Sequence, residues 1–234
     1  WGEGQERRFH MVRRWTELRD RRVLDVGCGV GMYTDAFLRH TPHVFGIEIE
    51  HERALEARTR AAGVIQAAGE HLPFSNAAFH IVFSHEVLEH VEDDRACIEE
   101  MVRVVGPGGR LVIFVPNRLY PFETHGIFWR GRYHFGNAPL VNWLPTFVRN
   151  RLAPHVRAYT VADLRQLLKG LPVRIVHHTQ IYPGYDKIVA RAPALGSLLR
   201  GITYALERTL LKAFGLSHFL VVEKEEVPPG DVRG

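Results

Sequence analysis

The sequence predicts an α/β fold, with one domain in which helices wind around a mostly parallel sheet. Three observations support this prediction. Short apolar runs alternate with amphipathic segments through the first half of the chain. A glycine-rich turn directly follows the first apolar run, in the sequence VLDVGCGVGMY at 23–33. The chain has 234 residues, 46% of them hydrophobic, which is enough for one substantial core.

The first half of the chain alternates helix and strand. Phe9, Val12 and Trp15 recur at helical spacing and predict an amphipathic first helix. The apolar run at 23–26 is expected to be a buried strand, and HVFGIEIE at 43–50 contains the next one. We expect helices at 6–19, 31–39, 51–61 and 93–105, and strands at 22–26, 43–47, 63–66 and 79–84.

The second half adds three strands and a capped helix. Thr160 and Asp163 have the spacing of a capping box and predict a helix that begins there. We expect this helix at 160–169 and strands at 109–115, 173–181 and 218–224. The tail at 227–234 begins with Val-Pro-Pro-Gly and is expected to be disordered, so the domain is predicted to span 1–226.

Composition limits the class of protein. The formal net charge is +4, but the basic residues are spread along the chain, so a solvated helix face is favoured over a nucleic-acid patch. The two cysteines, Cys28 and Cys97, cannot form a disulfide framework, which favours a reducing cytoplasm. No apolar run reaches the length of about 18 residues that a membrane span needs, and the first residues do not resemble a signal peptide.

The turn at 27–31 predicts a cofactor site. Gly27, Gly29 and Gly31 leave the backbone bare at the carboxyl end of the first strand, where a ligand can approach it. The third glycine comes one residue too early for the dinucleotide fingerprint, which makes a pyrophosphate cradle less favoured. Asp25 lies inside the strand, and a buried carboxylate there needs a partner such as a ligand ammonium group.

These residues resemble the first motif of class I S-adenosylmethionine-dependent methyltransferases, an acidic residue followed by G-x-G-x-G. GEHLPFSNAAFHIVFSHEVLEHV (69–91) and MVRVVGPGGRLVIFVPN (101–117) are similar to later elements of the small-molecule, ubiquinone-pathway-like branch. The resemblance covers about 20–117. It implies a doubly wound, Rossmann-like sheet of seven strands with an antiparallel last strand, and S-adenosyl-L-methionine as cofactor.

The resemblance also assigns cofactor contacts. Asp25 would bind the amine, and Glu48, which lies 17 residues after Gly31, would bind the ribose hydroxyls, with Glu50 as the weaker choice. Ala68 stands at the usual position of the adenine-reading acid, so the backbone beside it would take that role. Cys28 is expected to be a small packing residue rather than a nucleophile. The expected cofactor-binding residues are Asp25, Gly27, Cys28, Gly29, Gly31, Glu48, Gly69, Glu70, Leu72 and Ser84.

The string SHEVLEH after the fourth predicted strand carries the candidate metal site. In one helical turn, Glu86, Glu89 and His90 would share a face. This E-x-x-E-H pattern is similar to the magnesium-binding element of ubiquinone-pathway O-methyltransferases, so these residues are candidate ligands of Mg²⁺. A helix cap or a salt-bridge cluster is the alternative interpretation.

Two segments are additions to the minimal fold. The segment 119–151 carries eight aromatic residues and follows the fifth strand, which predicts either an aromatic substrate lid or a satellite hydrophobic cluster. The segment 194–216 is expected to be an amphipathic helix with leucines on one face and Arg200, Glu207, Arg208 and Lys212 on the other. It would pack on its own protein or a second copy, or contact a membrane surface.

The residues around the carboxyl end of the fifth strand complete the candidate site. His125 is the first choice of general base, and His90 is the second. Asn117, Tyr120, Glu123 and Trp129 are the expected substrate contacts.

The sequence favours a methyltransferase that acts on a small-molecule hydroxyl in a sugar, a lipid-linked glycan or a phenol. We expect it in the cytoplasm, either free or at the periphery of a membrane. No nucleic-acid partner is expected, because the fourth strand ends in FSHE rather than [DN]-P-P-[YF]. An RNA-binding or RNA-modifying protein and a non-catalytic cofactor-binding subunit are the alternatives.

Overall fold

A computed structural model describes residues 1–226; the predicted disordered tail at 227–234 lies outside them. The long elements agree with the expected ones to within a few residues, and the strand at 173–181 agrees at both ends. The first half contains α1 (Glu3–Trp15), β1 (Val23–Val26), α2 (Met32–Leu38), β2 (Val44–Glu48), α3 (His51–Arg58), β3 (Val64–Gln66), β4 (Phe79–His85) and α4 (Asp94–Val104). The second half contains β5 (Val105–Pro116), α6 (Val161–Leu168), β10 (Val173–Ile181), α7 (Asp186–Arg191), α8 (Pro193–Leu206), η2 (Leu210–Phe214) and β11 (Ser217–Lys224).

Seven strands form one sheet in the order β10-β11-β5-β4-β1-β2-β3. The strands β1 to β5 are parallel to one another, and β11 runs antiparallel to both β5 and β10. The predicted mostly parallel sheet with an antiparallel last strand is therefore confirmed. Because β1 lies between β4 and β2, the glycine turn and the end of β4 meet at one edge of the sheet.

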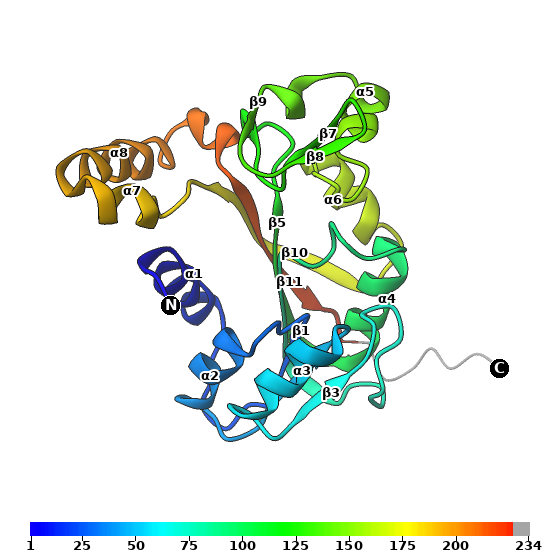
Figure 1. Ribbon diagram of the computed structural model, residues 1–234. Coiled ribbons are helices and arrows are strands. Elements are labelled where there is room, and N and C mark those ends of the chain that lie inside the picture. The colour runs from blue at the N-terminus through cyan, green and yellow to red at the C-terminus, as the bar shows by residue number, and fades with distance from the viewer. Residues whose placement is uncertain (227–234) are drawn as a thin grey trace.

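Helices cover both faces of this sheet (Figure 1). On one face, Phe9 of α1 and Phe37 of α2 pack on Phe83 and Phe114 from the strands. On the other face, α4 and α6 pack over the alternate residues of the same strands, including Leu111. The strand side chains alternate between the two cores because strand residues point to opposite faces in turn. The predicted capping box of α6 is present, with Thr160 and Asp163 bonded reciprocally.

The predicted lid folds as a separate layer above the carboxyl edge of β5. It contains β6 (Phe122–Glu123), β7 (Ile127–Trp129), β8 (Arg132–His134), β9 (Ala138–Pro139), η1 (Val141–Trp143) and α5 (Thr146–Leu152). Two small antiparallel pairs, β6–β9 and β7–β8, hold it together. Seven of its eight aromatic side chains are exposed, all but Tyr120, so they do not form a buried satellite cluster.

The predicted helix at 194–216 is shorter than expected. The helix α8 ends at Leu206, and Thr209 caps the separate helix η2 by accepting a hydrogen bond from the Leu211 amide. Glu207 ends α8 because its carboxylate accepts from the Tyr182 amide and pairs with Arg7 of α1. In residues 1–226, no helix is both long enough and apolar enough to cross a bilayer.

Candidate active site

The glycine turn has the open backbone that the sequence predicts. Gly27, Gly29 and Gly31 all have positive φ angles, of 67°, 56° and 84°. A Cβ on Gly27 would lie 2.4 Å from Val87 Cγ2, so the turn approaches the end of β4 too closely for any side chain. Among residues 1–226, nothing lies within 4 Å of a Cβ built on Gly29, which leaves that part of the turn open to a ligand.

Glu48 is fixed beside this turn. One of its carboxylate oxygens accepts from the Gly29 amide at 2.8 Å, and the other accepts from the Glu50 amide at 3.0 Å. Glu50 itself is exposed and pairs with Arg53 at 3.0 Å. The geometry therefore separates the two candidate ribose acids, because only Glu48 contacts the glycine turn.

Asp25 is buried in β1, and the hydroxyl of Thr34 donates to its carboxylate at 2.7 Å. Burial, together with the charge of Glu48, raises the pKa of Asp25 to about 7, although the Thr34 hydrogen bond opposes the shift. Burial also raises the pKa of the Cys28 thiol to about 12, which leaves no thiolate at neutral pH. The geometry of Cys28 is that of a packing residue.

The other predicted cofactor residues lie farther from open space. Leu72 is buried in the core, and Ser84 is buried in β4 opposite Val26. Gly69 packs against Cys97, whose Sγ would lie 2.8 Å from a Cβ on that glycine. Glu70 accepts from the Glu92 amide at 2.9 Å. The structure gives Leu72 and Glu70 structural contacts, and the cofactor contacts expected of this group stay a prediction.

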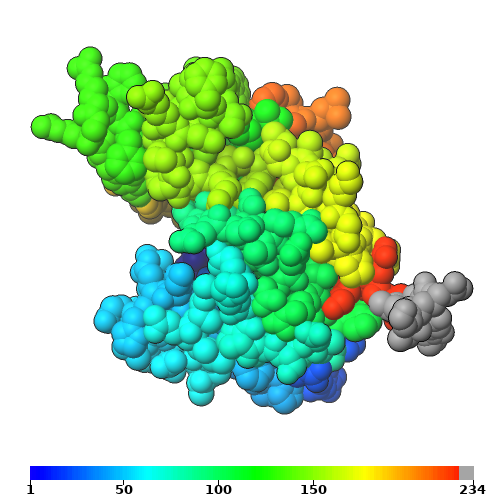
Figure 2. Space-filling view, turned by 90° about the vertical axis from the view of Figure 1, so that its right-hand side faces the viewer, coloured from blue at the N-terminus to red at the C-terminus, as the bar shows by residue number. Residues whose placement is uncertain are grey.

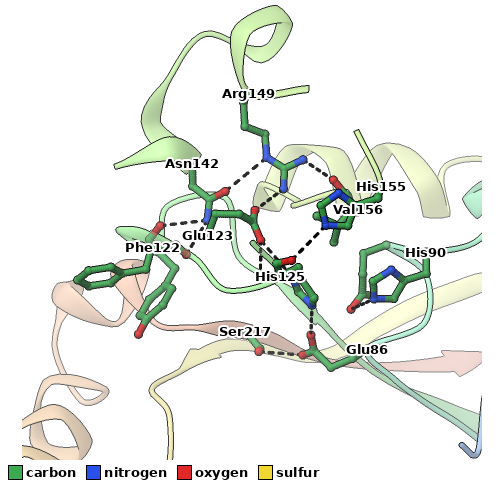
Figure 3. Close-up of polar contacts among 12 residues, drawn as sticks. Glu86, His90, Phe122, Glu123, His125, Asn142, Arg149, His155, Val156 and Ser217 are labelled. Atoms are coloured by element: carbon green, nitrogen blue, oxygen red, sulfur yellow. Dashed lines mark hydrogen bonds and ion pairs between the residues drawn. The ribbon is translucent and has the colours of Figure 1, made fainter. Parts of the chain in front are cut away.

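The string after β4 is a turn, and the prediction of a helical turn is wrong there. Glu86 has a φ of 56°, and its amide donates to the carbonyl oxygen of Phe114 in β5. This hydrogen bond extends the pairing of β4 with β5 by one residue. The positive φ of Glu86 is incompatible with an α-helix at this position. Glu86, Glu89 and His90 therefore do not share a helix face. Glu86 and His90 lie close together at the carboxyl edge of the sheet (Figure 3), and His90 Nε2 lies 3.9 Å from Glu89 Oε1.

His125 joins this group from the lid (Figure 3). Its Nδ1 lies 3.1 Å from Glu123 Oε1, and its Nε2 faces Glu86 Oε2 at 4.0 Å. Arg149 donates to the other oxygen of Glu123 at 2.6 Å. Burial would raise the pKa of Glu123, but the hydrogen bonds from His125 and the charge of Arg149 lower it, so Glu123 remains an anion. His125 is thus hydrogen-bonded through Nδ1, whereas Nε2 has only the longer contact with Glu86.

Glu89 is the unusual member of the group. It is buried, and neither carboxylate oxygen has a hydrogen-bond partner among residues 1–226. Burial and the charge of Glu86 raise its pKa well above the usual range. Burial alone would also raise the pKa of Glu86. The neighbouring His85 and Glu89 have the larger combined effect, so the pKa of Glu86 is lowered. Glu89 is therefore the protonated member of the pair and Glu86 the anion.

The expected metal ligands are only partly brought together. Ligand atoms of Glu89, His90 and His125 lie within 4.8 Å of one another, so His125 stands in the place predicted for Glu86. One carboxylate and two imidazoles suit a transition metal ion better than Mg²⁺, which prefers oxygen ligands. The structure does not support the predicted magnesium site.

A second group of unsatisfied polar atoms lies at the same edge of the sheet. Arg8 Nε, the Tyr33 hydroxyl and His85 Nε2 are buried and have no hydrogen-bond partner in residues 1–226. The rings of Tyr33 and His85 are 5.0 Å apart. Burial lowers the pKa of His85 to about 4; the charge of Glu86 opposes this shift and that of Arg8 adds to it. Arg8 Nε and the Tyr33 hydroxyl are unpaired buried donors of the kind that an anionic ligand satisfies.

Sequence reasoning missed Arg8 and Tyr33. Arg8 lies among the basic residues of 7–22, which the amphipathic pattern assigns to a solvated helix face. Tyr33 comes two residues after the last glycine of the turn, in the first turn of α2, and this position was the available signal. His85 belongs to the SHEVLEH string but carried no assignment.

The predicted substrate contacts differ in their placement. Asn117 is buried, and its amide donates to the carbonyl oxygens of Ala213 and Gly215, so its side chain holds the chain together. Glu123 is occupied by His125 and Arg149. Trp129 is 54% exposed in the β7–β8 hairpin, and Tyr120 is half-buried beneath the lid with a pKa raised to about 12 by burial.

A hollow separates the lid from the cofactor half of the molecule. Figure 2 shows it between the green lid segment and the cyan and light-blue residues, with dark-blue N-terminal atoms at its back. The lid and the N-terminal part of the sheet domain thus border one opening.

Known proteins match these features. The methyltransferase domain family matches residues 24–113. An uncharacterized methyltransferase of Mycobacterium tuberculosis is 32% identical over 164 residues, which cover 63% of this chain and 82% of that protein. A ubiquinone biosynthesis O-methyltransferase of Xylella fastidiosa is 34% identical over 118 residues, which cover 47% of this chain and 48% of that protein. The chain thus spans about half the length of this second relative.

Solved structures agree on the fold. A crystal structure of an S-adenosylmethionine-dependent methyltransferase from Mesorhizobium loti has a TM-score of 0.65 at 18% identity, covering 92% of this chain and 97% of that one. The [4+2]-cyclase SpnF has a TM-score of 0.60 at 18% identity, with 94% and 82% covered. Since one of these neighbours is named as a cyclase, fold likeness alone does not assign a reaction. The extent of the match to the mycobacterial relative, with the glycine turn and its two flanking acids, identifies the chain as a member of the class I S-adenosylmethionine-dependent methyltransferases.

Proposed function

We propose that this protein transfers a methyl group from S-adenosylmethionine to a hydroxyl of a small molecule, with His125 as the general base. The observation that carries the proposal is the Glu123–His125 pair, because Glu123 holds Nδ1 at 3.1 Å, whereas Nε2 has only a longer contact of 4.0 Å with Glu86 Oε2. The Xylella relative, named as an O-methyltransferase, supports a hydroxyl acceptor. The exposed aromatic residues of the lid favour an aromatic or lipid-linked acceptor over a free sugar.

The residues around the glycine turn fit the cofactor in three places. Glu48 offers a fixed carboxylate for the ribose hydroxyls, and Asp25 offers one for the amine. Arg8 and Tyr33 supply unpaired donors that suit the carboxylate at the amino-acid end of the cofactor. The raised pKa of Asp25 is consistent with this assignment, because a cationic amine nearby would stabilise the ionised form.

Bound S-adenosylmethionine supplies a methyl group on a positively charged sulfur, which departs as a neutral thioether when the acceptor oxygen attacks. The protein aligns the acceptor and excludes water. His125 Nε2 accepts the hydroxyl proton as the oxygen–carbon bond forms. Glu123 stabilises the resulting imidazolium, and Arg149 keeps Glu123 ionised.

A divalent transition metal is the alternative activator of the hydroxyl. Glu89, His90 and His125 would hold such an ion, and it would acidify a bound hydroxyl. Nδ1 of His125 is already engaged by Glu123, so Nε2 would serve either the metal or the proton. We favour the proton, because Glu123 already holds Nδ1 at 3.1 Å and orients the ring as a general base requires.

The test is His125→Gln, assayed with labelled S-adenosylmethionine against a panel of phenols, catechols and lipid-linked sugars. We expect kcat to fall by about 10² to 10⁴, while the Kd for S-adenosylhomocysteine in calorimetry stays within about twofold. The matched control is His134→Gln, since His134 is an exposed histidine of the same lid. Equal loss of turnover and cofactor affinity would reject His125 as the base, and loss of wild-type turnover in EDTA would favour the metal. Cofactor binding without turnover of any acceptor would favour the non-catalytic alternative.

A further inference from the structure

The helix α8 exposes its apolar face, whereas an ordinary surface helix exposes its polar face. The one charged side chain of α8, Arg200, faces the body of the protein and pairs with Glu3 and with Asp186, the latter at 3.1 Å. Just past its end, Glu207 pairs with Arg7 of α1. These contacts bind α8 to α1 through charges, and the apolar face is left on the outside.

The outward face is strongly apolar. Leu195 is 53% exposed, Leu198 61%, Ile202 50% and Leu210 91%. Leu195, Leu198 and Ile202 share one face of α8 at i, i+3 and i+7, and Leu210 and Leu211 follow in η2; we call these five residues the α8 surface. Phe214 of η2 extends it to the lid, because its ring lies 6.1 Å from that of Trp143. Exposed apolar stripes of this kind are uncommon on proteins that have no partner there.

The charges around the α8 surface all have one sign. Lys187, Arg191, Arg208 and Lys212 flank it, and none of them forms an ion pair in the described part of the chain. The segment 187–216 contains one acid, Glu207, which faces inward to Arg7. Leucine and isoleucine bordered by unpaired cations match the acyl chains and anionic headgroups of a bilayer.

We propose that the α8 surface docks this protein on anionic lipid membranes. A second copy of the chain fits less well, because a symmetric contact through this surface would bring the four cations of each copy against the same four cations. A nucleic acid would use the cations but would leave the apolar stripe exposed to water. A lipid surface satisfies both features.

Docking there would place the active-site opening beside the membrane. In Figure 1, α7, α8 and the lid lie at the same end of the sheet, the end where β5 leads into the lid. The β7–β8 hairpin adds exposed Trp129 and Tyr133 with Arg130 and Arg132, and such amphipathic aromatics suit the headgroup region. The inference goes beyond the proposed function, because lipid binding can be measured without any methyl acceptor.

The experiment is cosedimentation of the whole protein with vesicles. One set contains phosphatidylcholine alone, and the other contains phosphatidylcholine with one quarter phosphatidylglycerol. We expect binding to the anionic vesicles that weakens in about 0.5 M salt. Arg191→Gln with Arg208→Gln should lower the partition coefficient by about fivefold for each cation. Leu198→Gln with Ile202→Gln should lower it by about tenfold or more.

Matched controls separate these effects from damage to the fold. Leu55→Gln changes an exposed leucine on α3, 43% exposed, and Arg14→Gln changes an exposed arginine of α1. Both should bind vesicles as the wild type does, and thermal unfolding should show that the α8 variants are folded. Wild-type protein that stays in the supernatant with anionic vesicles, or α8 variants that bind as tightly as the controls, would overturn the proposal. A dimer in lipid-free ultracentrifugation that Leu198→Gln with Ile202→Gln dissociates would also overturn it and assign the surface to a second copy.

Discussion

At the scale of single residues, the two acids at the end of β2 show how position decides role. Glu48 and Glu50 are two residues apart and chemically identical. Glu48 is 6% exposed and bonded to the glycine turn, whereas Glu50 lies in solvent beside Arg53. Only the first can offer a fixed carboxylate to a ligand in the turn.

This difference predicts unequal effects of the same substitution. Glu48→Gln should weaken S-adenosylhomocysteine binding by about 2 kcal/mol, or about thirtyfold in Kd, because a charged hydrogen-bonding group is lost. Glu50→Gln should leave the Kd within about twofold. Isothermal titration calorimetry of both variants provides the measurement, and equal Kd values for the two would contradict the assignment of Glu48.

The sequence was sufficient for the residues whose role is local. The glycines, Asp25 and Glu48 lie in a continuous motif, and backbone geometry alone makes the motif recognisable. Arg8 and Tyr33 were missed because their meaning comes from meeting His85 of β4, more than 50 positions away in the chain. The turn at Glu86 was taken for a helix because its amide bonds to Phe114 of β5, a partner that no local pattern reveals.

At the scale of elements, β10 and β11 form the edge of the sheet around a histidine pair. His178 Nε2 lies 3.0 Å from His218 Nδ1, and His218 Nε2 lies 2.9 Å from the Tyr159 carbonyl oxygen. His218 must donate to that carbonyl, so its Nδ1 accepts from His178 when both rings are neutral. Burial, with the charges of His218 and Arg165 adding to it, lowers the pKa of His178 to about 4.

The pair predicts acid sensitivity of this edge. The pKa of His178 lies below its unfolded value of 6.5, so its contribution to the unfolding free energy is complete above that pH and is lost as the pH falls toward 4. Since His178 is partly exposed, we expect a loss of about 1 to 2 kcal/mol rather than the full shift. His178→Gln should flatten this part of the pH profile of urea unfolding, whereas the exposed His43→Gln should not. If the unfolding free energies of wild type and His178→Gln changed with pH in the same way, His178 would not be the source of the acid sensitivity.

The sequence predicted where helices and strands lie along the chain better than it predicted which face of a helix packs on the protein. The strand at 173–181 was placed at both ends because Pro172 and Pro183-Gly184 bound it. The amphipathic pattern of α8 was also recognised, yet the pattern does not say which face meets the protein. Glu3 and Arg7 on α1 decide that, because they pair with the polar face and leave the leucines outside.

At the scale of the whole molecule, α1 joins the cofactor half to the α7–α8 layer. The guanidinium of Arg7 lies 3.8 Å from the centre of the Tyr204 ring and pairs with Glu207. Both partners of this pair are largely buried, at 24% and 14% exposure of the side chains. A shielded pair that also stacks on an aromatic ring should contribute more than a solvent-exposed one.

A double-mutant cycle tests this connection. Arg7→Ala and Glu207→Ala should show a coupling energy of about 1 kcal/mol or more in thermal or urea unfolding. The same cycle at Arg39 and Asp35, an exposed i,i+4 pair at 72% and 43%, should give about 0.3 to 0.5 kcal/mol. Coupling energies of equal size would show that the α1–α8 contact does not depend on this pair.

Arg7 and Arg8 are neighbours on α1 and serve opposite sides of the molecule. Arg7 pairs with Glu207 beyond the end of α8, while Arg8 borders Tyr33 and His85 near the glycine turn. A shortened protein that lacks the first two helical turns would therefore lose both anchors in a single deletion. Diminished catalysis and diminished lipid binding in such a protein would share one origin, and point substitutions at positions 7 and 8 are needed to tell the two sites apart.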